Sequence, residues 1–213
     1  RSLVYYASWL DEVQNSPWLE SSYKRTKVWH YYNIDSGFNI DNMPRNPEGD
    51  ALSAIEMLTD SLENHFSELN DSVRMDYLRA LIHVVADIHC PMHVGHATDI
   101  GGNLTKVSWF MSKTTLHAVW DEKLINSVHS SWSYTEWQKN IDFVTKSEMA
   151  EMTKTEPREW VEESHKIAAY IYDYANRDTN YSFKYMYDNV KIVENQMIKA
   201  GYRLAYLLNR IFG

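Results

Sequence analysis

The chain has 213 residues, 44% of them hydrophobic, so it can bury a sizeable core, and we expect one domain over residues 1–213. Its net charge of −8 argues against a nucleic-acid interface that relies on basic side chains alone, although bound divalent metal ions would reverse the local charge. The single cysteine, Cys90, excludes an intramolecular disulfide and a zinc ribbon, and no apolar run of about eighteen residues predicts a transmembrane helix.

Apolar residues recur at spacings of three and four through most of the chain, which predicts a mainly α protein. The first such stretch predicts a helix over residues 3–13. Asp50 is a plausible N-cap for a helix that reaches about residue 66, and Asp71 for the helix that follows. Pro91 ends or kinks this second helix, because proline lacks the backbone N–H that the helix interior needs.

Residues 97–115 break the helical pattern. The turn sequence DIGGN and the alternating stretch LTKVSWF predict a short β-hairpin-like segment near 99–112. Helices are then expected over 116–129, 134–154, 157–175 and 186–211.

Residues 81–96, LIHVVADIHCPMHVGH, place histidines and an aspartate on an otherwise apolar helix. His83 and Asp87 are four residues apart, so they project from one face, and His93 follows beyond the expected kink. His117 and Asp121 form a second pair with the same spacing.

Two further candidates lie upstream, Asp11 in ASWLDEV and His30 in VWHYYN. A carboxylate on an apolar face costs several kcal/mol, about 2 to 7 for a polar group, unless a partner compensates it. A His–Asp hydrogen bond would serve for one pair, and each histidine could also be an ordinary buried core residue. A metal cluster would serve for all of them, since imidazole nitrogens and carboxylate oxygens are both good zinc ligands.

Four segments, ASWLDEV, VWHYYN, LIHVVADIHCPMHVGHATDIGGN and TLHAVWDEKLI, resemble in order the zinc-dependent S1/P1 nuclease family. The family signature runs H-x3-D-x-H-x-P-L/M-H-x-G, then D-x-GGN, then LH-x2-WD, and the match covers most of residues 7–126. The resemblance implies a mainly α, single-domain multi-helix bundle of the S1/P1 nuclease and zinc phospholipase C type. It also implies an endonuclease that hydrolyses single-stranded DNA or RNA to 5′-phosphorylated products, with 3′-nucleotidase activity common among its members.

The resemblance also assigns roles to the candidate residues. Asp87 would bridge from the first zinc ion towards a third, and Asp11 and Asp87 would take part in catalysis. The ligands that it implies are Asp11, His30, His83 and Asp87 for one zinc ion, and His93, His117 and Asp121 for a second.

Tyr31 and Asn33 stand where the family places an aromatic residue that stacks on a base and a polar residue that binds a base edge. The alternative for Tyr31 is ordinary core packing. Single-stranded nucleic acid or nucleotides are the expected binding partners, and no stable protein partner is implied.

Three departures from the family pattern bear on activity. The ligands of the third zinc ion, which the family carries in an N-terminal segment, have no counterpart here, so we expect two to three zinc ions and a sequence that lacks that segment. Gln14 and Thr115 replace a basic residue and an asparagine. Cys90 stands between ligands, either as a soft metal ligand or as a small buried residue.

Three sequons, at Asn70, Asn103 and Asn180, favour a glycoprotein that is secreted or resides in the lysosomal or vacuolar lumen. Two functional alternatives stay open. The chain could be a hydrolase similar to zinc phospholipase C, or a catalytically degenerate relative that keeps zinc for stability.

Overall fold

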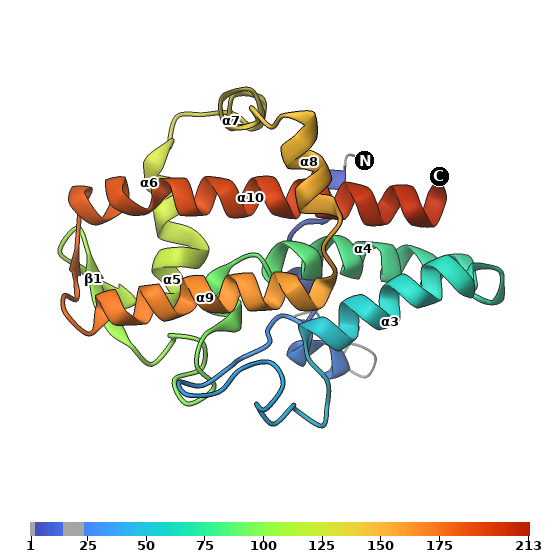
Figure 1. Ribbon diagram of the computed structural model, residues 1–213, viewed down its shortest axis with the longest axis horizontal. Helices are drawn as coiled ribbons and strands as arrows, with labels where there is room; N and C mark the ends of the chain where they lie inside the picture. The colour runs from blue at the N-terminus through green and yellow to red at the C-terminus, as the bar shows by residue number, and fades with distance from the viewer. Residues whose placement is uncertain (1–2, 15–23) are drawn as a thin grey trace.

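The computed structural model describes residues 3–14 and 24–213, and the mainly α fold predicted from the sequence is confirmed (Figure 1). The α-helices are α1 (Trp9–Gln14), α3 (Ala51–Asn64), α4 (Asp71–Asp87), α5 (Leu116–Ala118), α6 (Leu124–Val128), α7 (Tyr134–Ile141), α8 (Lys146–Thr153), α9 (Pro157–Ala175) and α10 (Phe183–Phe212). Shorter 3-10 turns cover Leu3–Tyr6, Lys24–Val28, Phe66–Glu68 and Pro91–Val94, and a π-type turn covers Val119–Lys123.

The long helix α10 organises the packing. It runs along the length of the molecule and contacts α3, α4, α6 and α8, while α3 also packs on α4 (Figure 1). Helix α9 covers the Pro91–Val94 turn from another side. The end of α4 is therefore enclosed by helices that are far apart in the sequence.

Two clusters of buried apolar side chains meet at the Pro91–Val94 turn. Met92 belongs to a cluster rich in aromatic residues beside the strands, and Val94 belongs to a cluster between α3 and α4. Both side chains are fully buried. Because these two residues pack into different clusters, the position of His93 between them is fixed by packing.

The strands β1 (Lys106–Trp109), β2 (Ser112–Thr115) and β3 (Asn180–Tyr181) form a small sheet in the order β2-β1-β3. The hairpin therefore begins later than the predicted 99–112, because DIGGN forms a separate turn. Asp99 holds this turn: its carboxylate accepts hydrogen bonds from Gly102 N, Thr105 Oγ1 and Tyr172 Oη at 2.6–2.8 Å.

The helix predicted over 3–13 is divided, and the expected cap of α4 is displaced. Only Leu3–Tyr6, as a 3-10 turn, and α1 are helical, and the Ala7 carbonyl between them accepts a hydrogen bond from His83. At α4, Asn70 rather than Asp71 is the N-cap, since its side chain accepts from Val73 N at 3.1 Å.

The helix predicted over 134–154 is two helices, α7 and α8. Ser133 with Glu136, and Thr145 with Glu148, form reciprocal capping boxes, so the second box starts a new helix where apolar spacing alone suggests continuity.

The last helix begins at Phe183, three residues earlier than predicted. No helix in the described ranges is long and apolar enough to cross a bilayer.

Gly101 offers a test of the conformation of the DIGGN turn. Its φ is +61°, and a Cβ atom there would lie 2.6 Å from the Met92 carbonyl oxygen, so Gly101→Ala should lower the free energy of unfolding by about 3 kcal/mol. The control is Gly201→Ala in α10, where a Cβ atom meets nothing within 4 Å and the change should stabilise by about 0.5 kcal/mol. Urea titrations of both variants give the comparison, and equal effects would contradict the assigned strain.

Candidate metal centre

The first group of site residues surrounds the carboxylate of Asp87 at the end of α4. Asp87 Oδ2 lies 2.9 Å from His30 Nδ1 and 2.9 Å from His83 Nε2, and these two ring nitrogens are 2.9 Å apart. The i, i+4 spacing on α4 brings His83 and Asp87 together, as the sequence predicted. His30 comes from the loop that follows the Lys24–Val28 turn.

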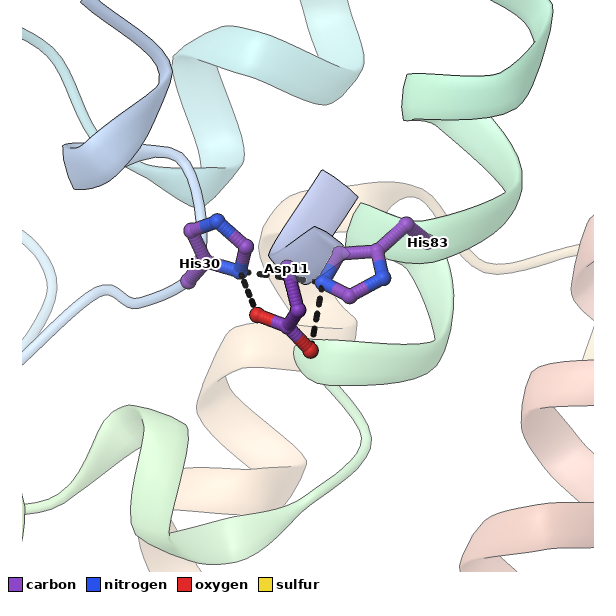
Figure 2. A group of neighbouring side chains, drawn as sticks. All are labelled: Asp11, His30 and His83. Carbon is purple, nitrogen blue, oxygen red and sulfur yellow. Dashed lines mark hydrogen bonds and ion pairs between the residues drawn. The ribbon is translucent and has the colours of Figure 1, made fainter. Parts of the chain in front are cut away.

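Asp11 completes this group from α1. Its carboxylate oxygens lie 3.5 Å from His30 Nδ1 and 3.8 Å from His83 Nε2. Figure 2 shows both imidazoles turning one nitrogen towards the Asp11 carboxylate. The Asp11 side chain is 57% exposed, so this group opens to solvent on the Asp11 side.

The second group adjoins the first through His93. His93 Nδ1 lies 3.8 Å from Asp87 Oδ2, and His93 Nε2 lies 3.4 Å from Asp121 Oδ1. His117 Nε2 is 3.7 Å from Asp121 Oδ2, and the His93 and His117 rings stack with centroids 5.2 Å apart. Cys90, His93 and Asp121 each offer one ligand atom within 4.8 Å of the others.

Backbone carbonyls fix the orientation of three imidazoles. The Nδ1 atoms of His83, His93 and His117 donate hydrogen bonds to the carbonyl oxygens of Ala7, His30 and Gly101, respectively. A carbonyl can only accept, so each Nδ1 carries a proton and each ring turns its Nε2 atom into the site, where the neutral form of the ring offers a lone pair to a metal ion. This is the orientation that metal-ligating histidines commonly have.

Asp87, whose side chain is 14% exposed, is charged even though burial disfavours its carboxylate. The charge of His93 and the hydrogen bonds from His30 and His83 outweigh burial and hold the pKa of Asp87 well below its ordinary value. Burial lowers the pKa of His93, but the charge of Asp87 and the carboxylate of Asp121 outweigh it and raise that pKa to about 9. In the metal-free protein, His93 is therefore cationic at neutral pH.

The pKa values of the other three site residues, His83, His117 and Asp121, are shifted by burial and by the charges beside them. Burial lowers the pKa of His83, yet the hydrogen bond and charge of Asp87 raise it overall. Burial and the charge of His93 lower the pKa of His117. His93 also holds the pKa of Asp121 below its ordinary value, against the effect of burial.

The donors fit a divalent cation in each group. His93 Nε2 is buried and makes no hydrogen bond within residues 3–14 and 24–213, with Asp121 Oδ1 3.4 Å away, so a metal ion that displaced its proton would satisfy this nitrogen. Imidazole nitrogens and carboxylate oxygens suit zinc and similar ions. The structure thus places all seven of the expected ligands in two adjacent candidate metal-binding groups, with Asp87 between them.

A cavity of about 520 Å³ opens beside these groups. Asp87, Cys90 and Asp121 contribute to its lining, and apolar side chains, including Trp120 and Leu204, form much of the rest. The metal-binding groups therefore border a space that is large enough for a small organic group.

Of the two predicted substrate residues, Asn33 lies near the second group. A Cβ atom on Gly101 would be 3.5 Å from Asn33 Oδ1 and 3.6 Å from His117 Nδ1, so Asn33 and His117 flank the same glycine. Asn33 Oδ1 has no hydrogen-bond partner in the described part of the chain. Tyr31 is partly buried, and its carbonyl oxygen accepts a hydrogen bond from Ala51 N at 3.0 Å.

Sequence patterns did not reveal the role of His89. It is buried, its Nε2 atom accepts a hydrogen bond from the buried Arg203 at 2.9 Å, and Arg203 also pairs with Glu163. Burial lowers the pKa of His89 to about 3, so this histidine is neutral and supports the end of α4. Its partner Arg203 lies 114 residues away, and no local pattern indicates that pairing.

The three sequons differ in accessibility. Asn180 is exposed at the edge strand β3, and Asn70 is exposed although its side-chain oxygen caps α4. The Asn103 side chain is partly buried, and its Nδ2 atom donates to the Ile100 carbonyl oxygen at 2.9 Å.

A helical fold that gathers histidines and aspartates at the end of one helix is typical of metal-binding proteins. The S1/P1 Nuclease family model matches residues 1–213, and the chain belongs to this family of nucleases. Endonuclease 3 from Arabidopsis thaliana is 28% identical over 99% of this chain and 76% of its own length. Nuclease P1 from Penicillium citrinum is 27% identical over 99% of this chain and 85% of its own length. Endonuclease 1 from Arabidopsis thaliana is 30% identical over 75% of this chain and 57% of its own length.

The raised pKa of His93 gives the metal-free protein a defined pH dependence. A raised folded-state pKa stabilises the protein below the ordinary histidine pKa of about 6.5, and this stabilisation is lost as the pH rises through about 9. Between pH 6 and pH 10, the chelator-treated wild type should lose about 3 kcal/mol more unfolding free energy than His93→Gln. Urea titrations at both pH values measure the difference, and parallel losses would contradict the assigned pKa.

Proposed function

We propose that this chain hydrolyses phosphodiester bonds in single-stranded DNA or RNA, giving 5′-phosphorylated products, with zinc ions bound by the two His/Asp groups. The observation that carries the proposal is the partly buried Asp87 carboxylate, which lies 2.9–3.8 Å from histidine nitrogens of both groups. Membership of the S1/P1 nuclease family supports the reaction class. A 3′-nucleotidase activity would use the same site.

Each of the two His/Asp groups would bind one zinc ion. Asp11, His30, His83 and Asp87 would hold one ion, and His93, His117 and Asp121 would hold the other. When bound, zinc would supply a Lewis acid that acidifies water and stabilises negative charge on phosphate oxygens. Two such ions also explain how a chain with a net charge of −8 attracts a polyanion.

The protein side chains would orient the reacting groups. His83, His93 and His117 are held by backbone carbonyls, so little reorganisation is needed when substrate arrives. Asp11 is the most exposed carboxylate of the first group, which lets it accept a hydrogen bond from water approaching the phosphorus atom. Asp87, held as a charged carboxylate, keeps the two groups at a fixed separation.

Base recognition would rely on Tyr31 and Asn33. A tyrosine ring can stack on the face of any base that a single strand exposes. Asn33 Oδ1 is unpartnered but buried next to His117, so it would accept a hydrogen bond from a base amino group after its side chain turns outwards.

One observation favours a second substrate class. The cavity beside Asp87 and Asp121 is lined largely by apolar side chains, and an acyl chain fits such a surface as well as a base does. A zinc phospholipase C-like activity is therefore the alternative that deserves a direct comparison. The family match makes the nuclease the primary proposal.

We also propose that the protein is secreted or lies in the lysosomal or vacuolar lumen, with N-glycans at its sequons. The exposure of Asn70 and Asn180 supports modification at these two positions, because an oligosaccharide needs an accessible side-chain amide. At Asn103, a glycan would have to replace the hydrogen bond to the Ile100 carbonyl oxygen.

Chelation and Asp87→Asn test the proposal together. Removing metal should abolish hydrolysis of single-stranded DNA, and added zinc should restore it. Asp87→Asn should lower the rate by about a hundredfold or more, because it removes the charge that the two groups share. The matched control, Asp60→Asn, changes an exposed carboxylate on α3 and should keep full activity.

Assays with single-stranded DNA and with phosphatidylcholine separate the two substrate classes. A wild type that binds zinc but hydrolyses neither substrate would indicate the degenerate relative.

Whether the Tyr31 ring stacks on a base is tested by measuring how its replacement changes KM and kcat. Loss of a stacked base costs about 1–3 kcal/mol, so Tyr31→Ala should raise KM for single-stranded DNA about ten- to a hundredfold. Tyr31→Phe keeps the ring and should leave KM nearly unchanged. If Tyr31→Ala instead lowers thermal stability while KM stays at the wild-type value, the ring serves core packing rather than substrate binding.

A further inference from the structure

We propose that Cys90 is a metal ligand, which binds through its sulfur the same ion as His93 and Asp121. This inference rests on the proposed metal centre and extends its ligand set. The family resemblance assigns no such role to this position, where Cys90 stands between the expected ligands Asp87 and His93.

Geometry places the thiol within reach of the ion. Cys90, His93 and Asp121 each have a ligand atom within 4.8 Å of the other two, a spacing that a single cation can bridge. Cys90 is also held between the two groups by the main chain: its N–H donates to the Asp87 carbonyl oxygen at 2.8 Å, and its carbonyl oxygen accepts from His93 N at 3.0 Å. The cysteine is therefore fixed next to the second group.

His93 provides an independent indication of a ligand at this place. His93 is 9% exposed, and its Nδ1 atom donates to the His30 carbonyl oxygen. Its Nε2 atom makes no hydrogen bond in the described ranges, with the Asp121 carboxylate 3.4 Å away. A buried nitrogen without a partner costs free energy unless something binds it. An ion shared with Cys90 and Asp121 satisfies that nitrogen.

The thiol suits this role chemically. Cysteine sulfur binds zinc as the thiolate, so on binding the S–H bond breaks, its proton passes to solvent, and the sulfur electron pair forms the bond to the metal. Cys90 lines the cavity that Asp121 also borders, which gives the ion and the leaving proton a route. A soft sulfur among nitrogen and oxygen donors would also favour cadmium and zinc over manganese at this position.

Cobalt substitution gives a direct readout. The full-length protein is stripped of metal and loaded with Co²⁺, and cobalt content and absorption spectra are recorded on the same sample. A thiolate ligand gives an intense sulfur-to-cobalt charge-transfer band in the near ultraviolet, which nitrogen and oxygen ligands do not give. Because the chain has one cysteine, any such band from the monomer comes from Cys90.

The expected result is bound cobalt with this band in the wild type. In Cys90→Ser the band should disappear, while the weaker visible bands of cobalt with nitrogen and oxygen ligands remain. If that variant does not fold, the wild-type spectrum alone decides. Bound cobalt without the band would overturn the role of Cys90 and leave the metal centre standing, whereas a wild type that binds no cobalt would overturn both.

Thiol labelling provides a second readout that does not depend on enzymatic activity. Cys90 in the metal-free wild type should react with a thiol reagent, and zinc should slow this reaction at least about tenfold, because a bound thiolate is blocked. Asp60→Asn is the control and should show the same protection. Equal reaction rates with and without zinc would contradict the proposal.

Discussion

The interaction on which the rest of the structure depends is the contact between the Asp87 carboxylate and the histidines around it. A buried carboxylate costs several kcal/mol, of order 2 to 7 for an unpaired polar group, unless opposite charge or hydrogen bonds compensate it. In the metal-free protein, the charge of His93 and the hydrogen bonds from His30 and His83 supply this compensation and keep Asp87 ionised. Cations bound in the same place, as proposed, would supply it more fully and would account for the many titratable groups at the end of an apolar helix.

The surrounding fold serves to hold these side chains still. Met92 and Val94 fix the turn that carries His93 by packing into separate clusters, and Tyr32 N donates to the His93 carbonyl oxygen at 2.8 Å. The DIGGN turn supplies the Gly101 carbonyl oxygen, which orients His117 by accepting a hydrogen bond from its Nδ1 atom at 2.9 Å. Groups arranged before substrate binds need little reorganisation during a reaction, so the rigid turn and helix end are what a hydrolytic centre requires.

The sequence predicted the helices around the site well and the long-range contacts poorly. Four-residue spacing placed His83 with Asp87 and His117 with Asp121, since that spacing is dictated by the helix itself. The proximity of Asp11 and His30 to α4 came from the family resemblance, because no local rule relates residues more than fifty positions apart. The division of the helix predicted over 3–13 escaped prediction because it depends on a distant side chain, His83, that bonds the Ala7 carbonyl. The pairing of His89 with Arg203 escaped for the same reason.

The most direct measurement of the central claim is X-ray diffraction at the zinc absorption edge from crystals of the zinc-loaded protein. We predict two anomalous-scattering peaks, one among Asp11, His30, His83 and Asp87, and one among His93, His117 and Asp121. Both peaks should vanish after treatment with chelator. Diffraction that shows these side chains ordered but no anomalous peak in either group would contradict the claim that the clustered histidines and aspartates bind metal.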